Sequence, residues 1–297
     1  MARHDRSPHH GSYHAAMSFP DSWRCPTCGT AVSTPHCPSC AERRLQARDL
    51  RMHGLLAQIA QSLSSVDSRL LRTLKSLLLR PGELTVAYLQ GRRKPFIAPF
   101  PFFLIVNVAF FAVQSFSGNA IFSTPLDSHL HSQDWSALAQ SLVGERLRAL
   151  DLPLASFTLL FDQAVQVNAK SLVILMTIPF AMVLALLMNR QERPLVAHAV
   201  FSLAFYAFFL IWLCVLLGVL FLLTRFIGLD LHSHAVDWGL FLSLLAATAV
   251  YLHRAVGVAY DLKGSRRALT VLVLTLTVGF GVLGYRFAIF LITLYWL

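Results

Sequence analysis

The sequence has little charge. Of its 297 residues, 25 are Lys or Arg and 15 are Asp or Glu, so charged residues make up 13% of the chain. Soluble domains carry roughly twice that share, about 25%. Apolar residues make up 56%, and the mean hydropathy is +0.58. The scarcity of charge excludes an ordinary soluble enzyme, and the apolar content excludes a disordered chain.

Residue patterns typical of catalysis are also lacking. The apolar runs contain no paired carboxylates, and the chain shows no recognisable Ser/His/Asp set and no phosphate-binding loop. No apolar run follows the first basic residues, so we expect no cleaved secretory signal. The sequence favours a protein that is not an enzyme, with a membrane enzyme acting on lipid-linked substrates as one alternative.

Charge is divided unevenly along the chain. Residues 1–96 hold 14 Lys/Arg and 6 Asp/Glu, whereas residues 97–297 hold 11 and 9. A basic head therefore precedes an apolar body, which predicts a membrane domain at 97–297. Within the head we expect three parts: a disordered tail at 1–20, a metal-binding ribbon at 21–44 and amphipathic basic linker helices at 45–96.

Five apolar runs are each about as long as the ~20 residues that a helix needs to cross a bilayer. They lie at about 97–117, 171–188, 196–224, 235–260 and 268–296, with an external segment at 118–170. Lipid offers no hydrogen-bond partners to the backbone, so such runs must be helical. The predicted fold is an all-α polytopic membrane protein with about five transmembrane helices and a small N-terminal cytoplasmic zinc ribbon.

The distribution of Lys and Arg predicts the orientation. Twenty of these residues lie in the head and in the 189–195 and 253–267 connections, whereas four lie in the 118–170 and 225–236 connections. Because cytoplasmic segments are enriched in Lys and Arg, we expect a bacterial inner-membrane protein with a cytoplasmic N-terminus and a periplasmic C-terminus.

Cysteine is rare, and four of the five cysteines fall within sixteen residues as two Cys-x-x-Cys pairs: Cys25, Cys28, Cys37 and Cys40. Two such turns bring four thiolates to one tetrahedral ion, so the pattern predicts a closed, structural zinc site. Two disulfides are the alternative, but they require an oxidising compartment, and the expected cytoplasmic location favours zinc. The ribbon is a candidate docking surface for a protein partner; nucleic-acid binding is less favoured because the basic head has no interleaved aromatic residues.

A leucine-rich segment follows the ribbon. Leu70, Leu71, Leu74, Leu77 and Leu78 recur at helical spacing, and Arg69, Arg72, Lys75 and Arg80 occupy the other positions. Two interpretations stay open. The helix lies on the inner membrane surface with its cations near anionic headgroups, or it packs on the ribbon or on the cytoplasmic ends of the spans.

A basic triplet, Arg92-Arg93-Lys94, lies directly before the first apolar run and predicts binding to anionic lipid headgroups. The two-pair ribbon, Arg80-Pro81-Gly82 and the run Tyr88…Gly91-Arg92-Arg93…Pro99 together resemble a bacterial inner-membrane protein family of unknown function. The resemblance covers about residues 25–104. It implies an inner-membrane protein with an N-terminal ribbon, and it implies no activity or catalytic residue.

Two segments of the expected outer side share a pattern of Asp and alternating His: Asp127, His129 and His131, and Asp230, His232 and His234. Histidine and aspartate are ligands for transition metals, and alternate residues of an extended segment face one way. A second metal site is one hypothesis, and two unrelated solvated loops are the other.

Two further residues of the apolar runs carry expectations. Pro179 is expected to kink the second run. Arg286 is expected either to pair with Asp237 near the outer boundary or to reach phosphates there, with residues 287–296 lying along the interface.

Transport and envelope assembly or maintenance are the roles that this architecture favours. A periplasm-facing transporter of metal or lipid is the other main alternative.

Overall fold

A computed structural model describes residues 22–45, 67–117, 121–191, 193–227 and 234–297. The first of these segments holds a short antiparallel pair, β1 (Trp23–Arg24) and β2 (Ala31–Val32). The other segments are helical: α2 (Asp67–Leu79), α3 (Glu83–Leu89), α4 (Pro99–Ser117), α5 (Leu126–His131), α6 (Ser136–Leu150), α7 (Leu154–Leu172), η2 (Val173–Met176), α8 (Thr177–Leu187), η3 (Asn189–Gln191), α9 (Leu195–Ile227), α10 (His234–Tyr260) and α11 (Gly264–Trp296).

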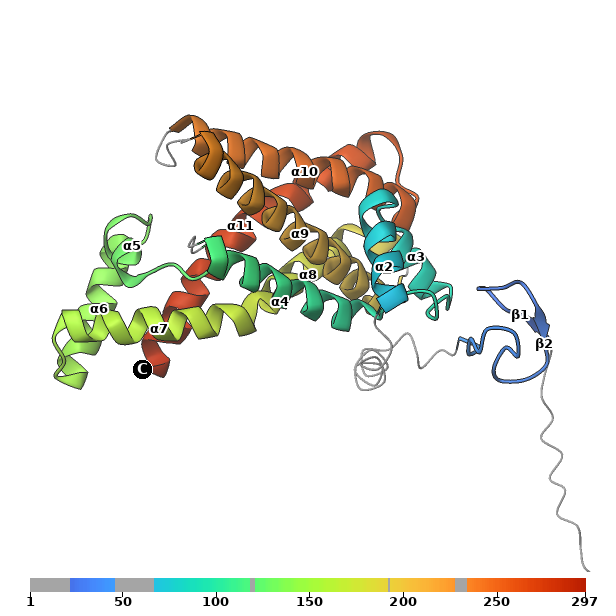
Figure 1. The fold of residues 1–297 in the computed structure, drawn as a ribbon, viewed down its shortest axis with the longest axis horizontal. Helices are drawn as coiled ribbons and strands as arrows, with labels where there is room; N and C mark the ends of the chain where they lie inside the picture. Colours follow the sequence, from blue (N-terminus) through green and yellow to red (C-terminus); the bar gives the residue numbers. More distant parts are fainter. Residues whose placement is uncertain (1–21, 46–66, 118–120, 192, 228–233) are drawn as a thin grey trace, which may run out of the picture.

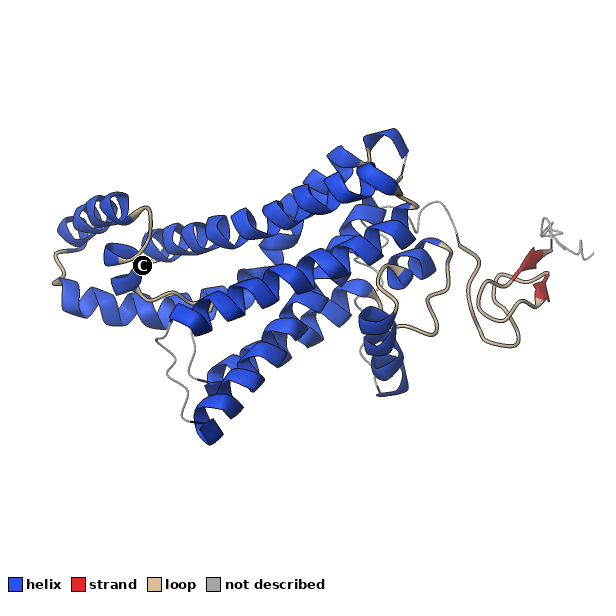
Figure 2. Ribbon diagram, turned by 90° about the horizontal axis from the view of Figure 1, so that it is seen from above, coloured by secondary structure: helices blue, strands red, loops and turns tan. Residues whose placement is uncertain are grey.

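Four helices, α4, α9, α10 and α11, are long and apolar enough to cross a membrane. They confirm the fold class and lie within a few residues of four predicted spans. The last predicted span, which corresponds to α11, differs in one respect. It continues as one helix to Trp296, whereas residues 287–296 were an expected interfacial segment if Arg286 reached the outer phosphates. The ribbon and the C-terminus lie at opposite ends of the bundle in both views (Figures 1 and 2).

The second predicted span, 171–188, differs more from the structure. Its regular helix α8 has only 11 residues, and α7 and α8 pass the length and hydropathy criteria only together, as a pair bent by 58°. The break lies at residues 171–172, whereas Pro179 lies within α8. The bend is therefore not at the proline where the sequence placed it, because the hydrogen bond that Pro179 removes would join residues 179 and 175, after the break. The four residues before α8 form the 3-10 turn η2. With α7 and α8 counted as one bent span, the described residues contain up to five segments long and apolar enough to cross a membrane.

Helix α9 is central in the bundle. Residues 201–210 are buried without interruption, so this half of α9 has no lipid-facing side. Its aromatic side chains pack face to face, with Phe180 and Phe205 rings 4.8 Å apart and Phe208 and Tyr251 rings 3.9 Å apart. A helix that is apolar on all sides is expected to be buried on all sides, and this part of α9 is.

The turn between α2 and α3 packs on the bundle through Gly82. This glycine has a φ of +91°, and a Cβ atom added there would lie 2.6 Å from the Ala255 carbonyl oxygen of α10. The buried face of α2 consists of Thr73, Ser76 and Leu77, and the Thr73 hydroxyl accepts a hydrogen bond of 2.9 Å from the Ile97 N–H. This face of the helix therefore packs on the ribbon-side end of the spans, as the second interpretation expects, so the first interpretation now concerns only the opposite, exposed face.

The end away from the ribbon is a lobe of α5, α6, α7 and the last part of α11 (Figure 1). Tyr285 donates a hydrogen bond of 2.9 Å to the Ala169 carbonyl and joins α11 to α7. The neighbouring Arg286 donates to the Ile121 carbonyl at 3.1 Å. The side chain of Asp237, its expected partner, lies outside the described part of the chain.

Candidate metal centre

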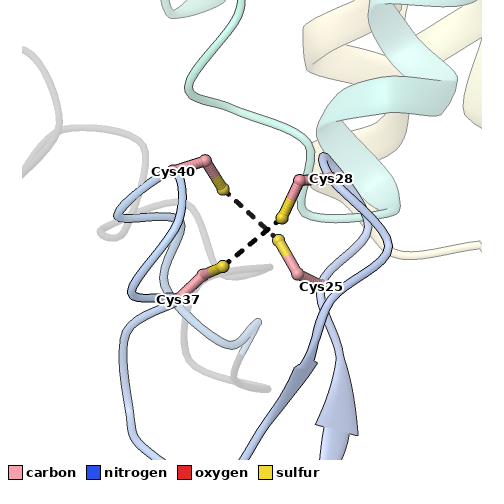
Figure 3. Close-up of side chains that lie close together, drawn as sticks. All are labelled: Cys25, Cys28, Cys37 and Cys40. Atoms are coloured by element: carbon pink, nitrogen blue, oxygen red, sulfur yellow. Dashed lines mark hydrogen bonds between the residues drawn. The ribbon is translucent and has the colours of Figure 1, made fainter.

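The four predicted cysteines converge on one point (Figure 3). Their Sγ atoms all lie within 4.8 Å of one another, and this is the one group of possible metal ligands among the described residues. Cys25 Sγ lies 3.5 Å from Cys40 Sγ, and Cys28 Sγ lies 3.4 Å from Cys37 Sγ. All four are free thiols, with sulfurs much farther apart than the ~2.05 Å of a disulfide.

Two turns of the same geometry position these thiols. The Gly29 N–H donates to the Cys25 carbonyl at 2.8 Å, and the Ala41 N–H donates to the Cys37 carbonyl at 2.7 Å. Gly29 has a φ of +75° and Ala41 a φ of +55°. The sequence has a glycine after the first Cys pair and an alanine after the second, and an alanine gives no signal of left-handed backbone. In the structure both turns contain a residue with left-handed backbone at this position.

The donor set fits zinc. A tetrahedral zinc ion with four thiolates at about 2.3 Å requires sulfurs about 3.8 Å apart, and the shortest separations here are 3.4 and 3.5 Å. Cys25 and Cys37 are buried, whereas Cys28 is exposed. Four sulfur ligands leave no position for water, so a metal held here has a structural role.

Local hydrogen bonds separate the acidities of the thiols. The Thr30 hydroxyl lies 3.2 Å from Cys28 Sγ, and hydrogen bonding from the Thr30 side chain and backbone lowers the pKa of Cys28 to about 6. A backbone hydrogen bond from Glu42 lowers the pKa of Cys40, but burial and the other three thiols raise it to about 12. Cys28 therefore reaches the thiolate form more readily than Cys40.

Glu42 joins the ribbon to the segment before the first span. Only 3% of this residue is exposed, and its Oε2 accepts hydrogen bonds from Thr27 Oγ1 at 2.8 Å, the Arg93 N–H at 3.2 Å and the Lys94 N–H at 3.0 Å. A second contact lies beside it, where Gly91 packs against the Leu45 side chain. Nothing in the sequence pointed to Glu42, because its partners lie 51 and 52 residues away.

This contact fixes the backbone of the basic triplet at Arg93 and Lys94. The guanidinium of Arg93 lies over the Tyr88 ring, 4.4 Å from its centroid, and Arg92 Nε donates to the Gln90 side chain at 3.2 Å. Lys94 is the exposed member of the triplet. Of the three predicted headgroup ligands, Lys94 is thus the one whose side chain points most freely outward.

The first segment of the second metal hypothesis does not have the expected extended form, because residues 126–131 form helix α5. His129 is 1% exposed and packs on Phe290 with ring centroids 4.7 Å apart. Burial and the nearby Arg286 lower the pKa of His129 to about 4. His131 is exposed beside Asp127, at 3.0 Å. The two histidines therefore face different surroundings.

The second segment of that hypothesis lies outside the described part of the chain. Residues 228–233, which include Asp230 and His232, are not described, and neither is the side chain of His234. The described group of metal ligands is thus the cysteine cluster alone.

One comparison with known proteins gives a match. A family model described as "Protein of unknown function (DUF3667)" matches residues 67–111, which are α2, the Gly82 turn, α3, the basic triplet and the first part of α4. The matched segment thus runs from the bundle-packing helix to the first span and leaves out the ribbon. Neither the curated proteins nor the solved structures contain a match to this chain.

Proposed function

We propose that this protein is a non-enzymatic integral protein of the bacterial inner membrane that acts in envelope assembly or maintenance. In this proposal the ribbon is a zinc-bound cytoplasmic module that docks a protein partner, and the membrane domain is its anchor. The N-terminus is cytoplasmic and the C-terminus periplasmic, as the distribution of Lys and Arg predicts.

The contact of Glu42 with the backbone of Arg93 and Lys94 carries the proposal. A zinc ribbon on a flexible tether would only raise the concentration of a bound partner near the membrane. The buried Glu42 carboxylate, with its three hydrogen bonds, instead holds the ribbon at the start of the first span. Hydrogen bonds to charged groups contribute about 1.5–3 kcal/mol each. A partner bound to the ribbon is therefore held at the membrane in a defined position.

In-cell photocrosslinking tests the docking role. A photoreactive amino acid at the exposed Ser39, beside Cys40, should give one discrete protein adduct in wild type. The adduct should be lost in Cys28→Ser and weakened in Glu42→Gln, while the amount of membrane-inserted chain is unchanged. The matched control is the same probe at Ser265, an exposed position in the first turn of α11. Equal adducts at both positions, or none at Ser39, would refute the docking role.

Lipid handling is a second candidate, favoured by one observation. An open groove of about 470 Å³ lies between η2, α8 and α11, lined by Leu175, Pro179, Phe280, Gly281 and Gly284 among others. Its volume is in the range of small-molecule pockets, and its walls suit an acyl chain. Gly284→Leu should fill this space, so unchanged phospholipid retention in purified Gly284→Leu would argue against this role.

A further inference from the structure

Helix α2 has two unlike faces. Thr73, Ser76 and Leu77 are buried against the bundle. On the opposite side Leu71 is 69% exposed, Leu78 is 41% exposed and Leu79 is 66% exposed. Three exposed leucines on a helix of 13 residues are unfavourable in water, because each buried leucine gains roughly 1.5–3 kcal/mol.

The exposed leucines share their face with cations. Leu71, Lys75 and Leu78 follow the i, i+4, i+7 spacing of one helix line, and Arg72 lies on the adjacent line with Lys75. Lys75 and Arg72 are both exposed, and Arg72 donates to the Ser68 carbonyl and hydroxyl of its own helix at 3.2 Å. The one acidic residue in α2 is Asp67, at its first position.

The position of α2 suits a membrane surface. Its buried face packs at the ribbon-side end of the spans through Gly82, which meets α10, and Figure 1 shows α2 running across the direction of α4. A helix that lies across the spans at their end runs along the bilayer interface. There, leucines enter the acyl boundary and cations lie near lipid phosphates.

We propose that the outward face of α2, formed by Leu71, Lys75 and Leu78 with Arg72 beside them, binds the surface of an anionic phospholipid bilayer. Charge complementarity decides the occupant, because apolar surface alone would accept a second copy of the chain equally well. The docking role of the ribbon does not depend on this surface.

Photocrosslinking of the full-length chain identifies the occupant. A photoreactive amino acid replaces Leu78, or Leu71 in a second variant, and the protein is irradiated in vesicles of equal parts phosphatidylethanolamine and phosphatidylglycerol. We expect a phospholipid adduct by mass spectrometry at both positions. Crosslinks to residues 46–66 of the same chain, crosslinks between two copies, or the absence of an adduct at both positions would overturn the proposal. Zinc content and gel filtration verify that each variant is folded.

Charge variants test the anionic preference. Each cation near an anionic surface strengthens association roughly five-fold. The double variant Arg72→Gln, Lys75→Gln should therefore reduce the adduct at Leu78 to its yield in phosphatidylcholine vesicles. The control Lys263→Gln, Arg266→Gln removes two exposed cations at the same end of the bundle and should leave the yield unchanged. An equal yield in anionic and neutral vesicles, or an equal loss in both double variants, would overturn the preference.

Discussion

Gly82 is the point where the linker packs most closely on the membrane domain, and replacing it with alanine tests that packing. Its φ of +91° lies in the left-handed region, where a Cβ costs about 1–2 kcal/mol. The added atom would also lie 2.6 Å from the Ala255 carbonyl oxygen and 3.0 Å from Val258 Cβ. Both belong to α10, and a helix carbonyl has little freedom to withdraw.

Overpacking in a tight interface costs about 1–3 kcal/mol. Together with the backbone conformation, Gly82→Ala should destabilise the docked state of α2 and α3 by about 2–5 kcal/mol. The measurement is hydrogen exchange of residues 67–89 in the purified full chain, with apparent thermal stability as a second readout. Exchange should rise in this segment and stay unchanged in α10 and α11.

Gly144→Ala is the matched control. Gly144 lies within α6, and a Cβ added there would meet nothing within 4 Å, so alanine should stabilise the helix by about 0.5–1 kcal/mol. If Gly82→Ala and Gly144→Ala show the same exchange and stability, the Gly82 turn does not hold the linker on the bundle, and the reasoning fails.

Four further predictions concern the ribbon and the topology. Purified protein should contain about one zinc per chain, and Cys28→Ser should lose it while the spans stay inserted; wild type without zinc and with paired thiols would contradict the site. Zinc affinity should fall as the pH is lowered, because protons compete for the thiolates, and chelator competition that shows the opposite trend would refute thiolate ligation. Ala41→Gly should tighten zinc binding up to about five-fold, since it removes a left-handed alanine costing about 1 kcal/mol; weaker binding would show that the Ala41 turn is not strained. A reporter after Leu297 should be periplasmic and one in the 189–195 loop cytoplasmic, and cytoplasmic activity at both would remove one crossing.

Apolar runs were sufficient to predict α4, α9, α10 and α11, because a helix surrounded by lipid or protein leaves a continuous apolar sequence. Helix α7 left no such run. Its buried line is Phe157, Phe161, Val165 and Ala169, whereas Gln163 and Lys170 are exposed on the other side. Helix α7 takes part in the bent second segment by packing against α11. A contact between helices so far apart in the chain cannot be inferred from the local sequence of α7.

The metal centre was predictable because its pattern is also local. The two cysteines of each Cys-x-x-Cys pair lie in one turn, so their spacing is visible in the sequence. The partners of Glu42, Thr73 and Arg286 were not, because each contacts a backbone group distant in sequence. A backbone N–H or carbonyl is present at nearly every residue, so the sequence gives no indication of which one a side chain will reach.

Helix α11 links the two sides of the membrane as a single rod. Its 33 residues extend about 50 Å, against about 30 Å of hydrocarbon. At one end the Arg267 side chain bonds the His253 carbonyl at 2.6 Å, and at the other Phe290 packs on His129. A change in tilt of about 5° would move one end about 4 Å relative to the other. A displacement of the lobe at one end of α11 would thus move the turn before Gly264 at its other end, without any change of conformation within the helix.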